Sequence, residues 1–219
     1  MNTEKILTME PKYTVIQLHP VPVCRPEEEY IIYDKTLKFI NELEFNPRDR
    51  GGGGNGARSA NSYILECKEL LGLKKFIEKH IDYYAHEFFK VSRKHQFYIT
   101  QSWVNFNRKG QRHHAHHHAN SLLSGVFYVA GDDCPINFSN SRYQIFGSSF
   151  DVKIAEGNLY NAKGFRVANE NFRLILFPSY VEHFVEPNMH DTPRISLSMN
   201  TFIKGSMGTK DSLTEVIFK

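Results

Sequence analysis

The residues of this chain best suited to chemistry are histidines in its second half. Five of the six residues from His113 to His118 are histidines, and His183 follows far along the chain. Neutral imidazole is a good ligand for Fe(II), zinc and related metals. Side chains of an extended strand alternate between its faces, so His116 and His118 would share a face and could chelate one ion. The pattern indicates a metal centre with His183 as a third ligand.

The spacing alone leaves the register of the histidine pair open, because His114 and His116 are also two residues apart. His113 and His117 fit a loop, or positions around the ligands, better than ligand positions. A histidine-rich tract can also bind metal adventitiously. A specific metal site needs side chains from separate segments of the chain. His183 and the arginine described next are such side chains.

A strand with one polar face is expected after His183. From Arg194 to Asn200, polar and apolar side chains alternate, and the polar face begins with Arg194 and Ser196. A buried arginine without a partner is very costly, so the guanidinium needs an anion if this face points inward. A guanidinium and a hydroxyl together make a good carboxylate clamp. A dicarboxylate with one end on the metal and the other on Arg194 would satisfy both patterns.

The segments that must position these side chains are mainly typical of strands. They are short, rich in Phe, Tyr, Val, Ile and Ser, and separated by loops. Helices first and short strands later favour an α+β fold, a β-barrel or sandwich with a helical N-terminal layer. The predicted strands cover residues 97–106, 121–130, 135–139, 173–178 and 193–203.

Two helices are predicted before these strands. The three glutamates at 27–29 are typical of a helix N-terminus, and an apolar stripe at helical spacing follows as far as Leu43. A second helix is expected from about Tyr63 to Val91. Between them, Gly51–Gly56 is expected to be a loop, either a surface linker or a mobile lid over a substrate. The stripe of the first helix consists of Tyr30, Tyr33, Leu37, Ile40 and Leu43.

Composition narrows the class of protein. The 219 residues include 27 basic and 24 acidic side chains, a net charge of +3 that gives no support to a nucleic-acid partner. Three widely spaced cysteines without a CxxC motif exclude zinc ribbons and redox dithiols and favour a reducing, intracellular setting. No leader-like N-terminus and no apolar run of the ~20 residues that span a membrane is seen. A cytoplasmic protein without a membrane partner is therefore expected.

Three segments resemble motifs of the iron(II)/2-oxoglutarate-dependent oxygenase superfamily. The resemblance is to a branch with the pattern H-x-H, then H, then R-x-S, common in phage and bacterial genomes; a phage-encoded protein would act in the host cytoplasm. It is strong over about residues 97–205 and looser over the N-terminal hundred. The matching segments run from His116 to Val129, from Leu176 to His183 and from Pro193 to Asn200.

The resemblance implies a double-stranded β-helix core, also called a jelly-roll or cupin-like fold, with N-terminal helices packed on it. A single domain is expected over residues 1–219. Its helical N-terminal part would cover 1–95, and its catalytic jelly-roll core would cover 96–205.

The resemblance also implies that His116, His118 and His183 are the iron ligands. It favours this register because Ala119-Asn120-Ser121 follows the pair, as in the branch. Most members of the superfamily have H-x-D instead of H-x-H, so a carboxylate from Asp132 or Asp133 is the alternative to His118.

By the same resemblance, Arg194 would bind the distal carboxylate of 2-oxoglutarate with the help of Ser196. Asn105 lies where some relatives place an Asn that contacts the co-substrate, and Tyr128 is a further candidate contact. The implied activity is that of a dioxygenase that uses Fe(II), 2-oxoglutarate and O₂ and releases succinate and CO₂. Hydroxylation is the expected outcome.

The prime substrate is left open between a protein side chain and a small molecule, and a homodimer is a further expectation. Two alternatives remain. One is a cupin-like enzyme whose three-His metal acts without 2-oxoglutarate, which the Arg-x-Ser motif disfavours. The other is a non-catalytic metal-bound jelly-roll protein.

Overall fold

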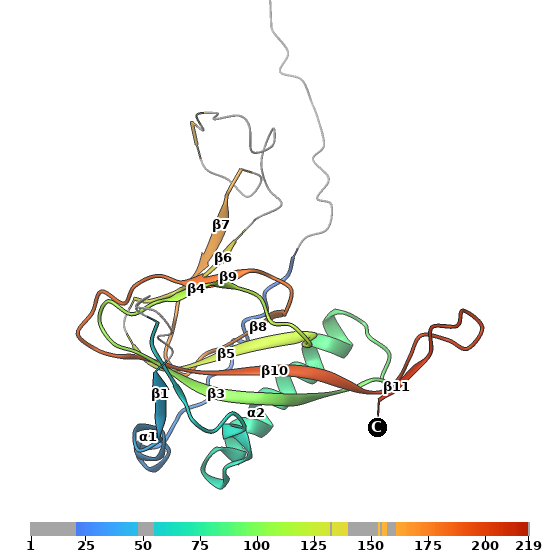
Figure 1. Ribbon diagram of the computed structural model, residues 1–219, viewed down its shortest axis with the longest axis horizontal. Helices are drawn as coiled ribbons and strands as arrows, with labels where there is room; N and C mark the ends of the chain where they lie inside the picture. The colour runs from blue at the N-terminus through green and yellow to red at the C-terminus, as the bar shows by residue number, and fades with distance from the viewer. Residues whose placement is uncertain are drawn as a thin grey trace, which may run out of the picture.

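The computed structural model shows two antiparallel sheets that face each other, with helices on the outer side of the larger sheet (Figure 1). No described helix is both long and apolar enough to cross a membrane. The described residues are 21–47, 55–131, 133–139, 153, 155–156 and 161–218.

The larger sheet has seven strands in the order β1-β2-β3-β10-β5-β8, and β11 also pairs with β10. Its two longest strands, β3 and β10, lie side by side at the centre of Figure 1. The bounds are β1 Phe45–Pro47, β2 Ala57–Ser59, β3 Gln96–Asn107, β5 Leu123–Ala130, β8 Leu174–Pro178, β10 Arg194–Met207 and β11 Val216–Phe218.

The smaller sheet has four strands in the order β4-β9-β6-β7. It lies above the larger sheet in the view of Figure 1. The bounds are β4 His113–His116, β6 Ile136–Ser139, β7 Gly164–Val167 and β9 His183–Val185.

Alternation along the strands divides the core into two layers. On β10, Ile195, Leu197 and Met199 belong to the cluster packed against the helices. On β5, Val126 and Tyr128 belong to a second cluster, shared with β6 and β8, between the sheets. A period of two residues places neighbouring side chains on opposite faces of a sheet. The polar face of β10 is therefore directed toward the smaller sheet, as its sequence pattern predicts.

The first predicted helix is shorter than its sequence suggests. Helix α1 runs from Asp34 to Asn41, and residues 27–33 are not helical, so the prediction of a helix opening at Glu27 was wrong. The physical reason is a tertiary contact: the Tyr30 backbone N–H donates to the Phe172 carbonyl, 3.1 Å away. A backbone group used in this way is not available to a helical ladder.

The second predicted helix is a succession of helical segments. Cys67 has extended backbone angles and separates two 3₁₀ turns, η1 (Ile64–Glu66) and η2 (Lys68–Leu70). The α-helix α2 then covers Leu71–Asp82, and a π-helix, η3, covers Tyr83–Phe88. Together they pack on the outer face of the larger sheet.

The five predicted strands agree with β3, β5, β6, β8 and β10 to within a few residues at their ends. Sequence reasoning missed strands of three or four residues, which are too short for a periodic pattern. Two of them, β1 and β2, extend the larger sheet, so the N-terminal part contributes strands as well as helices. Of the glycine loop, residues 51–54 lie outside the described residues, and Gly56 is buried just before β2.

Candidate metal and co-substrate site

His116, His118 and His183 form a compact cluster in the space between the sheets. Each offers one ring nitrogen, and these three atoms lie within 4.8 Å of one another. The His116 and His183 ring centroids are 4.4 Å apart, and the His118 centroid lies 5.1 Å from each. Within the part of the chain that the structure describes, this is the group of three side chains that could hold a metal ion.

Strand pairing positions two of the three histidines. His116 at the end of β4 lies directly opposite His183 at the start of β9. His118 lies two residues beyond β4, just before the turn at Ala119 and Asn120, and so outside the strand on which alternation predicts it. The turn contains Asn120 at φ 54°, a left-handed conformation that asparagine tolerates well.

Buried hydroxyl groups hold the turn that follows His118. The His118 N–H donates to the Ser179 carbonyl, 3.0 Å away. The Ser179 hydroxyl is 2.7 Å from the hydroxyls of both Ser121 and Ser124, and Ser124 donates to Oδ1 of Asn200 at 2.9 Å. The network ties the turn to β5, β8 and β10. The hydroxyls therefore fix a cluster residue that has no strand to hold it.

Hydrogen bonds set the tautomers of two cluster residues. His116 Nδ1 lies 2.8 Å from the His114 carbonyl, and His183 Nδ1 lies 2.9 Å from the Val181 carbonyl. A carbonyl only accepts, so each Nδ1 carries the proton and each Nε2 keeps its lone pair. Burial, reinforced by the neighbouring His116, lowers the pKa of His183 to about 3. His183 is therefore neutral and able to bind metal at physiological pH.

Arg194 lies buried in the same space, with 2% of its surface exposed. Its Nη1 donates to the Ser196 hydroxyl at 2.9 Å, and its Nε donates to the Cys134 carbonyl at 3.1 Å. Its guanidinium carbon lies 5.3 Å from the centre of the Tyr128 ring. Among the described residues no carboxylate forms an ion pair with Arg194, although a buried cation requires an anion nearby. An anionic ligand would meet that requirement.

The other two predicted contacts lie beside this arginine. Tyr128 is fully buried, and burial raises the pKa of its hydroxyl while the charge of Arg194 offsets part of the effect. Asn105 is 3% exposed; its Nδ2 donates to the Ser198 hydroxyl at 2.9 Å, and its Oδ1 accepts from Trp103 Nε1 at 3.1 Å. Asn105 thus shapes the wall next to Arg194.

One cavity of about 220 Å³ joins the histidine cluster to Arg194. The structure therefore brings together every predicted site residue except Tyr128, which lies directly behind Arg194. His114 is exposed, and Asp133 is exposed and lies 3.1 Å from Arg166, so neither belongs to the cluster. Asp132 lies outside the described residues. The lining residues that sequence reasoning left unassigned are Arg58, Ser62, Gln101, Trp103, His113, Val126, Ile136, Val185, Ser198 and Asn200.

The sequence pattern could have assigned some of these residues to the cavity. Ser198 and Asn200 share the polar face of β10 with Arg194, so alternation could have assigned them to the site. Trp103, the only tryptophan of the chain, is half-buried in the cavity wall. Arg58 had no sequence signal, because only the pairing of β2 with β3 places it opposite Asn105.

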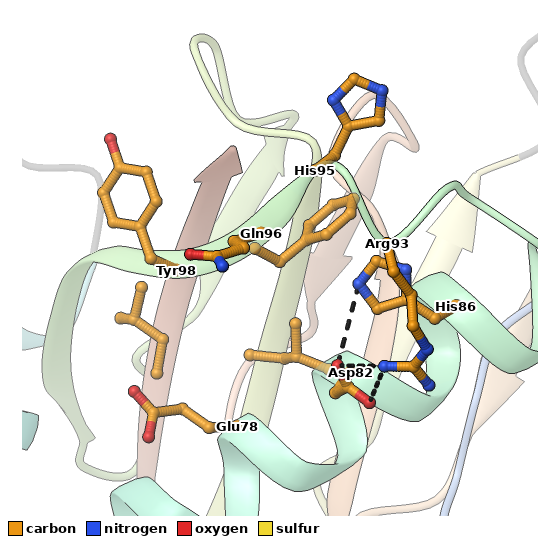
Figure 2. A pocket seen from close by; sticks show the side chains of 10 residues that line it. Glu78, Asp82, His86, Arg93, His95, Gln96 and Tyr98 are labelled. Carbon is orange, nitrogen blue, oxygen red and sulfur yellow. Dashed lines mark hydrogen bonds and ion pairs between the residues drawn. The ribbon is translucent and has the colours of Figure 1, made fainter. Parts of the chain in front are cut away.

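A second cavity, of about 290 Å³, lies between α2, η3 and the start of β3 (Figure 2). Three of its lining side chains are paired with one another: Asp82 lies 3.7 Å from His86 Nε2 and 3.4 Å from Arg93 Nη1. None of the histidine cluster lines it. The larger cavity thus lacks the metal-binding chemistry of the smaller one.

The donor set fits a divalent metal. Three imidazoles, two of them with Nε2 lone pairs fixed by hydrogen bonds, suit Fe(II), zinc or nickel. The nearby buried guanidinium and hydroxyl suit the carboxylate of a second ligand.

Comparison with known proteins agrees with this chemistry. A family model described as "putative 2OG-Fe(II) oxygenase" matches residues 101–200, which include the histidine cluster and Arg194. A search of curated proteins finds no match.

Several solved structures share the fold. A prolyl-4-hydroxylase from Pseudomonas putida is 13% identical, covers 86% of this chain and 94% of its own, and has a TM-score of 0.52. HygX from Streptomyces hygroscopicus, with nickel, 2-oxoglutarate and hygromycin B bound, is 8% identical over 83% and 82% of the two chains, with a TM-score of 0.52. The epimerase SnoN from nogalamycin biosynthesis, in complex with Fe³⁺, alpha-ketoglutarate and nogalamycin RO, is 13% identical over 77% and 71%, with a TM-score of 0.53.

At these identities the solved structures establish the fold, and they confirm the predicted double-stranded β-helix. The family match concerns sequence and covers the segment in which the motifs were found. The cofactors of this family are Fe(II), 2-oxoglutarate and O₂, in agreement with those expected from the motifs. Residues 101–200 of this chain are therefore similar in sequence to the family described as "putative 2OG-Fe(II) oxygenase".

Proposed function

We propose that this protein is an Fe(II)- and 2-oxoglutarate-dependent dioxygenase that hydroxylates its prime substrate. The observation that carries the proposal is a single cavity lined by a three-histidine cluster and by a buried arginine that has no carboxylate partner among the described residues. A metal site and an anion site in one cavity are what a chelating dicarboxylate requires.

In this proposal His116, His118 and His183 hold the iron. The bound iron and 2-oxoglutarate supply the oxidative chemistry, in which O₂ is consumed and succinate and CO₂ are released. Arg194 binds the distal carboxylate, because its buried guanidinium lines the same cavity as the histidines. Ser196 accepts from Nη1 and so fixes the orientation of the guanidinium fork.

Apolar side chains cover His183, the most buried of the three proposed ligands. The Phe177 and Phe138 rings lie 4.8 and 6.1 Å from the His183 ring, centre to centre, and leave His183 only 4% exposed. The burial of Arg194 likewise strengthens its attraction to a carboxylate.

Hydroxylation is compatible with the lining of the cavity. Hydroxylation needs no acid, base or hydrogen donor from the protein. The described side chains that line the cavity include no carboxylate, thiol or phenol. The protein's part is thus to bind and orient its ligands.

The test is an anaerobic titration of the Fe(II)-loaded protein with 2-oxoglutarate, following the visible charge-transfer band of the chelate. The band is expected in the wild type and should be greatly weakened in Arg194→Ala. Ser196→Ala is a milder variant, which should bind the co-substrate more weakly and still fold. Arg108→Ala removes an exposed arginine outside the cavity and serves as the control.

Iron binding without such a band would overturn the 2-oxoglutarate proposal. It would favour a three-His enzyme that acts without this co-substrate. Hydroxylation itself is tested by mass spectrometry of candidate substrates under labelled dioxygen, where the product should gain one labelled oxygen atom.

A further inference from the structure

The cavity continues beyond the part assigned to the co-substrate. Its floor follows the polar face of β10 and the facing residues of β3, in the register Ser196↔Asn105, Ser198↔Trp103 and Asn200↔Gln101. At about 3.3 Å per residue, the six steps from Arg194 to Asn200 span roughly 20 Å. A five-carbon diacid anchored at Arg194 leaves the far part of this floor to another molecule.

A second cation lines the same cavity, two strands across from Ser196, since Arg58 pairs with Asn105 and Asn105 pairs with Ser196. Arg58 of β2 lies opposite Asn105 and lines the cavity at its exposed rim. No ion pair joins Arg58 to another described residue, and no described lining residue carries a carboxylate. Because Arg194 is buried next to Ser196, the two cations occupy different parts of the cavity.

Trp103 connects Arg58 to the histidine cluster. Its indole N–H donates to Asn105, the residue opposite Arg58, and its ring centre lies 5.9 Å from that of His118. A compact apolar group packed on this ring would lie beside the cluster. An anionic group on the same molecule could reach the rim.

We propose that Arg58 binds a carboxylate of the prime substrate, whose apolar carbon group packs against Trp103 next to the metal ligands. The inference rests on the proposed function, since it assigns Arg194 to the co-substrate. The planar guanidinium fork of an arginine can bind a carboxylate through two parallel hydrogen bonds. Arg58 lies outside the segment that the family model matches, so this recognition is a feature of the chain around that segment.

The test compares two probes of the same shape that differ by one charge, N-acetyl-L-valine and N-acetyl-L-valinamide. Each is titrated anaerobically into the Fe(II)- and 2-oxoglutarate-saturated protein. Because Trp103 is the only tryptophan, its fluorescence reports occupation of this part of the cavity. Calorimetry gives the affinity.

The carboxylate probe should bind about five- to tenfold more tightly than the amide, as expected for a charged hydrogen bond at a partly exposed site. Arg58→Gln should remove most of this preference, and Arg58→Lys should keep part of it. Lys75→Gln removes an exposed charge on α2, far from the cavity lining, and should leave the preference intact.

The co-substrate band is read in the same samples. Wild-type protein that shows the band but binds both probes equally would overturn the assignment of Arg58 alone. A band lost in Arg58→Gln but kept in Arg194→Ala would overturn it as well, because Arg58 would then be the co-substrate anchor. Absence of the band in the wild type would count against the proposed function itself.

Discussion

At the scale of single residues, the histidines of the run differ because the fold gives them different surroundings. His116 and His183 each have Nδ1 against a backbone carbonyl, so Nε2 is left with the lone pair that a metal needs. His114 is exposed, and only its carbonyl takes part, as the acceptor for His116. Histidines that look alike in the sequence therefore differ in whether a ring nitrogen is held ready to bind a metal.

Loss of one proposed ligand should sharply weaken metal binding. We expect His118→Ala to lower the affinity for Fe(II) by more than about tenfold, since even changes in the partners of metal ligands cost that much. His114→Ala, which removes an exposed ring, should change the affinity less than about twofold. Anaerobic Fe(II) titration with a competing chelator measures both. Equal losses in the two variants would mean that His114 also binds the metal.

At the scale of elements, the turn after β4 is the least regular part of the site. His118 is held by its backbone bond to Ser179, and Ser179 is held in turn by the hydroxyls of Ser121 and Ser124. A buried hydroxyl that loses its partner costs as much as a lost hydrogen bond. The position of His118 therefore depends on contacts with β5 and β8 as well as on the end of β4.

Removing the central hydroxyl should affect stability and metal binding together. Ser179→Ala should lower the free energy of unfolding by about 1–2 kcal/mol. It should also weaken Fe(II) binding by about tenfold, because His118 is then less well held. Chemical denaturation and metal titration measure the two effects. Ser206→Ala, at an exposed position of β10, is the control. If Ser179→Ala leaves the affinity for Fe(II) unchanged, the hydroxyl network supports only the fold.

The π-helix η3 joins the N-terminal segment to the body of the molecule through Tyr84. Its buried hydroxyl donates to the Pro22 carbonyl, 2.8 Å away. Burial raises the pKa of Tyr84 above its ordinary value. The native state therefore favours the neutral phenol more strongly than the unfolded chain does.

This shift gives stability a dependence on alkaline pH. Below about pH 10 both states are neutral at this residue and the contribution of Tyr84 is fully present; above that the unfolded chain ionises first and the contribution is lost. Tyr84→Phe should be less stable than the wild type by about 1 kcal/mol at neutral pH. The difference should shrink above pH 10. Denaturation at several pH values measures it, and a constant difference would contradict the assignment.

At the scale of the whole molecule, the two halves of the site come from different sheets. His116 and His183 belong to the smaller sheet, whereas Arg194 and Ser196 belong to the larger one. A dicarboxylate bound to both the metal and Arg194 would connect the sheets across the cavity. Binding energy of that kind adds to the stability of the native state.

Ligands should therefore raise the melting temperature cooperatively. At about 100 times its Kd, one ligand adds about 2.7 kcal/mol, which for a chain of this size raises Tm by about 5 to 10 °C. Fe(II) and 2-oxoglutarate together should raise Tm by more than the sum of their separate effects. Thermal denaturation under anaerobic conditions measures this, with chelator-treated protein as the reference. Strictly additive shifts would mean that the two ligands do not meet.

The sequence by itself determined the central strands and the chemistry of the site. Alternation along β10 predicted that Arg194 and Ser196 share an inward polar face, because the period of a strand is set by its backbone. The residues His116, His118 and His183, chosen from spacing and motifs, lie together in space. The local sequence pattern is enough to predict these residues, because they lie on or next to strands and motifs that are easily recognised in the sequence.

Only the tertiary structure decided where other backbone groups find their partners. Residues 27–33 carry a helical pattern but are not helical, because the Tyr30 N–H donates to the distant Phe172 carbonyl and not to a helical neighbour. Trp103 and Arg58 reach the cavity through strand pairings between segments far apart in the chain. Such pairings depend on the packing of the whole molecule, and no local period of the sequence encodes them.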